Sequence, residues 1–152
     1  MDLVYNRPED SFDRSMQPKA APAKMAIVPD YYKETFDNGL KIIGTKSSEI
    51  PKIYMRLKIE GGELLVDKKL TGLAQLTADM MSESTSKYTS EDISVELQKL
   101  GSSISFSADE DGTIMYIESL TKNIDATLAL AEEKLLKPAF NKDDFKRVKK
   151  QT

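Results

Sequence analysis

The feature that most constrains the fold is a change of hydrophobic period near residue 62. Residues 53–60 alternate apolar and polar side chains without a fault, which is the pattern of a β-strand, and this run ends at two glycines. Beyond the glycines, apolar side chains recur at helical spacing, as in Leu73, Leu76 and Met80. Strands that precede helices and return after them favour an α+β fold.

The rest of the chain follows the same two periods. The pair Asn38-Gly39 between alternating runs predicts a β-hairpin with a type I′ turn. Thr89 or Ser90 stands where a helix cap is expected, and Asn141 with Asp144 three residues later resembles a capping box. We predict a largely antiparallel sheet with helices packed on one face. The expected elements are strands at 31–36, 40–43 and 53–60, helices at 71–83 and 90–100, strands at 103–108 and 113–120, and helices from 123 and 141.

The composition excludes the common catalytic mechanisms that need histidine or cysteine. The 152 residues include no His and no Cys, so the chain can build neither a Ser-His-Asp nor a Cys-His nucleophile system, and it lacks the usual zinc ligands. Its 22 basic and 25 acidic residues leave a net charge of −3. Because nucleic acids and anionic membranes attract basic surfaces, we expect neither as a partner.

Residues 1–30 differ in composition from the remainder. They hold four of the six prolines and none of the seven glycines. Proline-rich segments with little apolar content favour extended or disordered structure. We therefore predict a Pro-rich linker over residues 1–30, or equally a loose N-terminus, ahead of an α+β domain at 31–152. The four prolines are Pro8, Pro18, Pro22 and Pro29.

Two charged segments have alternative interpretations. Residues 107–112 with Glu118 nearly fit an EF-hand calcium loop, but both flanks alternate with period two, which favours a hairpin turn. The basic cluster Lys146, Arg147, Lys149 and Lys150 would suit an anion. Cations near a helix C-terminus also complement its dipole, so we expect a solvated helix face.

The order of several motifs resembles the pitrilysin/insulinase family of zinc metallopeptidases. The resemblance begins with N-G-L-K-I-I at 38–43 and the strand that ends in Gly-Gly. It continues through L-T-G-L-A-Q-L-T-A-D-M-M at 70–81, L-Q-K-L-G-S-S at 97–103 and P-A-F-N at 138–141. Together these motifs cover nearly all of the expected domain.

In that family, T-G-L-A precedes H-x-x-E-H, in which two His bind zinc and the Glu serves as general base. The resemblance places Gln75 at the first ligand, Ala78 at the base and Asp79 at the second ligand. All three positions have changed, so we expect no catalytic residue and no metal in this chain. The third ligand of the family would fall at or beyond Thr152.

The resemblance implies the N-terminal part of a truncated, non-catalytic half of such a peptidase. Such a half packs against a zinc-bearing half, in the same or a companion polypeptide, and forms a peptide-binding chamber. The chain itself would be inactive, zinc would lie only in the partner half, and a periplasmic or otherwise exported location would fit. The alternative is a structural or assembly protein that uses the same fold without a role in proteolysis.

Overall fold

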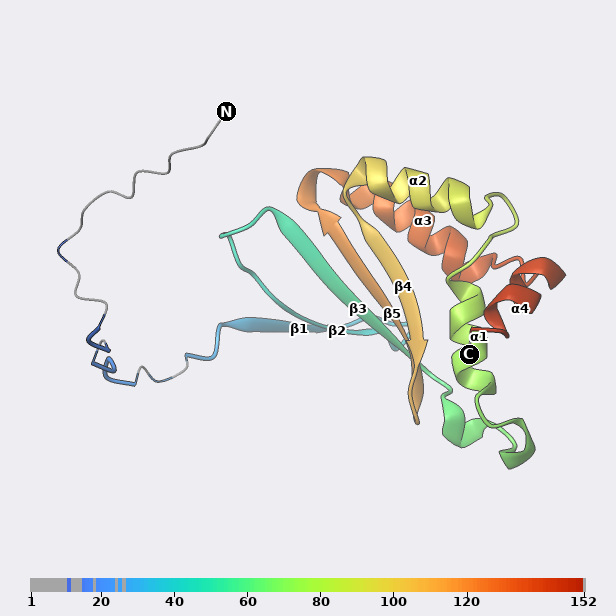
Figure 1. The fold of residues 1–152 in the computed structure, drawn as a ribbon, viewed down its shortest axis with the longest axis horizontal. Coiled ribbons are helices and arrows are strands. Elements are labelled where there is room, and N and C mark those ends of the chain that lie inside the picture. The colour runs from blue at the N-terminus through green and yellow to red at the C-terminus, as the bar shows by residue number, and fades with distance from the viewer. Residues whose placement is uncertain (1–10, 12–14, 18, 24, 26, 152) are drawn as a thin grey trace. The chain divides into compact units, whose positions relative to one another are not determined.

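The structure is a computed structural model that describes residues 11, 15–17, 19–23, 25 and 27–151. It contains two compact units, one ending at Lys46 and one beginning at Ser47 (Figure 1). The described residues between 11 and 30 are exposed and belong to no helix or strand. Pro8 and Pro18 lie outside the described residues, and the linker stays a prediction.

The first unit carries the predicted hairpin, with a different turn. β1 (Tyr31–Thr35) pairs antiparallel with β2 (Lys41–Thr45). The Gly39 amide donates to the Phe36 carbonyl at 2.9 Å, and Gly39 has φ +85°, whereas φ is not positive at the preceding asparagine. A tight turn that ends in one left-handed glycine makes a three-residue hairpin loop. The type I′ prediction was wrong, because that turn needs positive φ at both central residues.

The second unit is built on a three-stranded antiparallel sheet. Its strands are β3 (Lys52–Glu60), β4 (Ser103–Ala108) and β5 (Gly112–Leu120), in the order β3-β5-β4. The register pairs Leu57 with Met115, and Met115 with Phe106, so these side chains share one face. The central strand, β5, therefore pairs with β3, which precedes α1 and α2 in the chain, and with β4, which follows them.

Four helices lie on one side of this sheet (Figure 1), which confirms the α+β prediction. None of the described helices is both long and apolar enough to cross a membrane. They are α1 (Leu73–Met81), α2 (Ser90–Leu100), α3 (Ile124–Leu136) and α4 (Lys142–Val148), with short 3₁₀ turns at Glu63–Leu65, Lys68–Leu70 and Thr121–Asn123.

The core lies between the sheet and the helices, and some apolar residues of the predicted strand at 53–60 and helix at 71–83 lie outside it. Met55 and Leu73 are each 42% exposed, whereas Ala78 is 0% exposed. The apolar stripe of α1 therefore coincides only in part with its buried face, because Met80 is buried as predicted whereas Leu73 is exposed and Ala78 takes its place. The buried cluster comprises Ala78, Ile93, Leu97, Ile104, Phe106, Met115, Ile117 and Ala131.

Three hydroxyl groups bridge the elements beside this core. Thr127 of α3 lies 2.8 Å from Ser119 of β5 and 2.8 Å from Ser102, which follows α2. Ser102 also donates to Ser119 at 3.1 Å. Because Ser119 and Thr127 are fully buried, mutual hydrogen bonding offsets the cost of removing their hydroxyls from water.

Both predicted helix caps are present. The Thr89 hydroxyl accepts from the Asp92 amide at 3.1 Å, and the Asp92 carboxylate accepts from the Thr89 amide, which completes a capping box. Asn141 Oδ1 accepts from the amides of Asp143 and Asp144. These contacts are local in sequence, which is why spacing alone predicts them.

Gly62 allows the chain leaving β3 to lie against the β4–β5 hairpin. The next amide, that of Glu63, donates to the Asp109 carbonyl at 3.0 Å. A Cβ atom at Gly62 would overlap the Asp109 carbonyl oxygen and the Gly112 nitrogen. Both neighbours are backbone atoms, so a side chain here must move a strand or a turn.

We predict that Gly62→Ala lowers the free energy of unfolding by about 2 kcal/mol, because the added methyl overpacks this contact. Urea unfolding followed by circular dichroism measures the change. Glu60→Ala, two residues earlier on an exposed position, is the control and should leave the midpoint nearly unchanged. Equal midpoints for the two variants would contradict the prediction.

Candidate functional site

The three positions singled out by the sequence lie on one stripe of α1. Gln75, Ala78 and Asp79 are spaced i, i+3 and i+4, and Ser82 follows one turn later. Ala78 is fully buried against the core, while Gln75 and Asp79 are half-buried beside it. The structure thus brings all three predicted positions together, on the side of α1 that faces β4.

Gln75 connects this stripe to the sheet. Its Nε2 donates to Asp79 Oδ1 at 2.7 Å, and its Oε1 accepts from the backbone amide of Ala108 at 3.1 Å. Ala108 is the last residue of β4, so one side chain joins two turns of α1 to the end of a strand. Both ends of the carboxamide are therefore hydrogen-bonded.

These residues do not fit a zinc ion. Two tetrahedral zinc ligands at 2.0–2.1 Å from the metal lie about 3.3 Å apart with the ion between them. Here the Gln75 amide donates directly to the Asp79 carboxylate, and Ala78 has no group that can take a proton. Within the described part of the chain, no group of three or more His, Cys, Asp or Glu side chains could hold a metal ion.

The N-terminus of α1 is held by a carboxylate from outside the helix. Gly72, with φ +89°, precedes α1 and offers no capping side chain. Glu63 instead accepts from the Gly72 amide at 2.6 Å and the Ala74 amide at 3.3 Å. A negative charge at a helix N-terminus also complements the helix dipole. Sequence reasoning missed Glu63, because a cap nine residues away has no periodic signal.

The C-terminus of α1 is held by a buried lysine. Lys134 of α3, 2% exposed, donates to the carbonyl oxygens of Ser82 at 2.7 Å and Glu83 at 3.1 Å. Burial lowers the pKa of Lys134 to about 8, while the Glu83 carboxylate opposes this shift. The helical spacing of Lys134 from the buried residues Thr127 and Ala131 is the sequence signal that could have revealed it.

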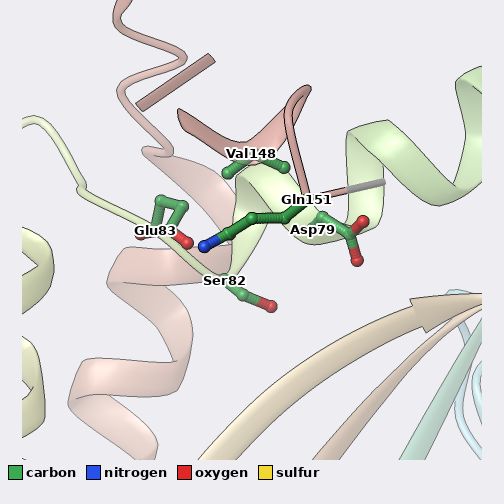
Figure 2. A pocket seen from close by; sticks show the side chains of 5 residues that line it. All are labelled: Asp79, Ser82, Glu83, Val148 and Gln151. Atoms are coloured by element: carbon green, nitrogen blue, oxygen red, sulfur yellow. The ribbon is translucent and has the colours of Figure 1, made fainter. Parts of the chain in front are cut away.

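A hollow of about 470 Å³ lies beside this stripe, between the end of α1 and α4 (Figure 2). Figure 2 shows the amide end of Gln151 directed toward Glu83. Glu83 also forms an ion pair with Arg147, which connects the end of α1 to α4 across the hollow. The hollow is lined by Asp79, Ser82, Glu83, Val148 and Gln151.

The possible calcium loop is a strand connection, as predicted. Asp109 Oδ1 accepts from the amides of Asp111 at 3.2 Å and Gly112 at 2.8 Å, which closes the turn between β4 and β5. Glu118 lies in β5 and forms an ion pair with Lys52. An EF-hand loop would need a helix on each side.

The basic cluster near the C-terminus is engaged with neighbouring side chains. Lys146 lies 3.6 Å from Asp143, and Arg147 pairs with Glu83 and lies 3.5 Å from Asp144. All four basic residues of the cluster are exposed, as expected for a solvated helix face.

Comparison with known proteins yields one family. Residues 41–152 match the model of the insulinase family, peptidase family M16. Over 112 residues the chain is 24% identical to the mitochondrial-processing peptidase subunit beta of Rattus norvegicus and 22% identical to that of Mus musculus. Each alignment covers 74% of this chain and 23% of the relative.

Two solved structures are similar in fold. A peptidase M16 inactive domain from Pseudomonas fluorescens matches with a TM-score of 0.73 and 25% identity, over 80% of this chain and 30% of that one. A protease from Helicobacter pylori matches with a TM-score of 0.68 and 18% identity, over 82% and 30%. The chain thus spans less than a third of the length of each of these four proteins.

We predict that Lys134 makes stability rise with pH above about 8. The folded chain releases this proton near pH 8 and the unfolded chain near 10.5, so the unfolded state binds more protons between these values. The gain approaches roughly 3 kcal/mol by the upper end of this range. Urea unfolding of the unchanged chain and of Lys134→Met, at several pH values, isolates this contribution, and a pH-independent difference would refute it.

Restoring the family motif by Gln75→His, Ala78→Glu and Asp79→His should destabilise the chain and produce no zinc-dependent cleavage. A Glu at position 78 would place a carboxylate in the core, at a cost of at least about 2 kcal/mol. The double variant Gln75→His/Asp79→His, which keeps Ala78, is the matched control for stability. Zinc-dependent cleavage of a fluorogenic peptide by the triple variant would contradict this account.

Proposed function

Since the chain belongs to the insulinase family (peptidase family M16), we propose that it is part of a non-catalytic half that packs against a zinc-bearing half and completes its peptide-binding chamber. Members of the family work as paired halves, and zinc belongs to the catalytic ones. This chain supplies neither the ligands nor the base, so its contribution to proteolysis is the surface that it offers to the partner and to the peptide.

The observation that carries the proposal is the direct hydrogen bond from Gln75 to Asp79 beside the buried Ala78. Where a catalytic half needs two ligands and a base, this chain has an amide, a methyl group and a carboxylate that stabilise the fold. Likeness to a solved M16 domain described as inactive supports the same interpretation.

The outer face of the three-stranded sheet supports packing against a partner. Tyr54 is 70% exposed, and the Arg56 guanidinium lies 5.7 Å from the centre of the Tyr116 ring. These side chains line a hollow of about 310 Å³ together with Glu118. Tyr and Arg are the residue types enriched where protein interfaces bind most strongly, so we assign this face to the contact.

We predict that this chain, extended to the end of its domain, raises peptide turnover by a separately produced H-x-x-E-H half from the same source. The increase should saturate as the chain is added, because two halves sharing one chamber bind with a defined stoichiometry. Turnover of an internally quenched peptide, measured with and without the extended chain, provides the test. Stable association without a change in turnover would favour the assembly alternative instead.

A matched pair of variants tests whether the outer face of the three-stranded sheet forms the contact in the same experiment. Tyr54→Ser on the outer sheet face should shift the saturation to higher concentrations, whereas Tyr31→Ser, which changes a similarly exposed tyrosine in the hairpin unit, should not. Equal behaviour of the two variants would remove this face from the proposed contact.

A further inference from the structure

β4 is an edge strand of its sheet, and two of its outward backbone amides already have partners. On one side it pairs with β5, from Ser103 to Ala108. On the other side, the Phe106 amide donates to Ser82 Oγ at 3.3 Å, and the Ala108 amide donates to Gln75 Oε1 at 3.1 Å. Alternate residues of an edge strand direct their amides outward, so α1 side chains accept the bonds that a neighbouring strand would accept.

The small side chain at position 78 permits this arrangement. Ala78 lies between Gln75 and Ser82 on the same stripe, and it has no exposed surface. With only a methyl group there, α1 approaches β4 closely enough for both polar side chains to reach the strand. A longer residue at position 78 would hold the helix away from the edge.

Asp79 fixes which end of the Gln75 carboxamide meets the strand. A carboxylate only accepts hydrogen bonds and a backbone amide only donates. The carboxamide satisfies both partners in a single orientation, with Nε2 toward Asp79 and Oε1 toward Ala108. Asp79 therefore acts as a positioning residue for Gln75, whereas the opposite rotamer would leave both contacts repulsive.

We infer that Gln75, Ala78, Asp79 and Ser82 form a seal that closes the β4 edge to an added peptide strand. An extended peptide that joins a sheet edge must bond to the outward amides of that edge. In this chain, two of those amides are occupied from within. The inference rests on the proposed function, because it states that a peptide in the shared chamber does not bind this half as a strand beside β4.

The seal is tested first by amide hydrogen exchange in the ¹⁵N-labelled chain. Gln75→Met keeps the size of the side chain but removes both hydrogen bonds, and should accelerate exchange at the Ala108 amide by at least about tenfold. Unchanged exchange at Met115, in the core of β5, shows that the variant is folded. Thr77→Ala, on the exposed side of α1, is the matched control and should have no effect at Ala108.

The second measurement adds a peptide. The probe is a soluble peptide of alternating valine and threonine with a lysine at each end, and amide chemical shifts report where it binds. The peptide should shift the Phe106 and Ala108 amides of Gln75→Met/Ser82→Ala but not those of the unchanged chain. Shifts at β4 of the unchanged chain, no shifts in the double variant, or exchange at Ala108 that Gln75→Met leaves unaltered would each overturn the inference.

These readouts are independent of the turnover assay. The exchange and shift experiments use this chain alone, whereas the proposed function is tested by stimulation of a zinc-bearing half. Stimulation with a freely exchanging β4 edge would refute the seal alone. A protected edge with no stimulation would refute the chamber role alone.

Discussion

The close contact of α1 with the edge of β4 is the constraint on which the rest of the second unit depends. Ala78 is fully buried at the centre of this contact, so the distance from helix to sheet is set by a methyl group. Gln75 and Ser82 then reach the strand on either side. Because α1 lies so close to β4, it leaves no room for a further strand beside β4, which is the edge of the sheet.

Two charged side chains from other elements hold α1 in this position. Glu63, which follows β3, accepts hydrogen bonds from backbone amides at the N-terminus of α1. Lys134 of α3 donates to backbone carbonyls at the C-terminus of α1. Each charge has the sign that the helix dipole favours at that end. A helix of nine residues is marginal by itself, so these contacts and the packing of Ala78 supply what local propensity does not.

The same arrangement gives Gln75, Ala78 and Asp79 a structural role in this chain. On the alignment proposed from the resemblance, a catalytic half would carry two zinc ligands and a base at these positions, which must remain accessible. Here Ala78 is buried in the core and Gln75 joins Asp79 to the end of β4, while Asp79 also lines the hollow beside α4. Under the two proposals above, the same side chains that replace the zinc motif also occupy the edge of β4.

Local sequence was sufficient to predict the order of strands and helices, the caps at Thr89 and Asn141, and the antiparallel α+β class. Each of these depends on residues within a few positions of one another, where period and capping chemistry are directly visible. The likeness to a peptidase family also located the three altered positions on α1, because the motif that precedes them is continuous in the chain.

Tertiary structure alone decided which face of α1 is buried and what holds its ends. Hydrophobic periodicity correctly marks Met80 as buried, but it gives weight to the exposed Leu73 and none to the buried Ala78, so the exact position of the buried face depends on packing. Glu63, Lys134 and the bond from Gln75 to Ala108 join residues far apart in sequence. Such contacts exist only after the chain has folded, so no local pattern encodes them.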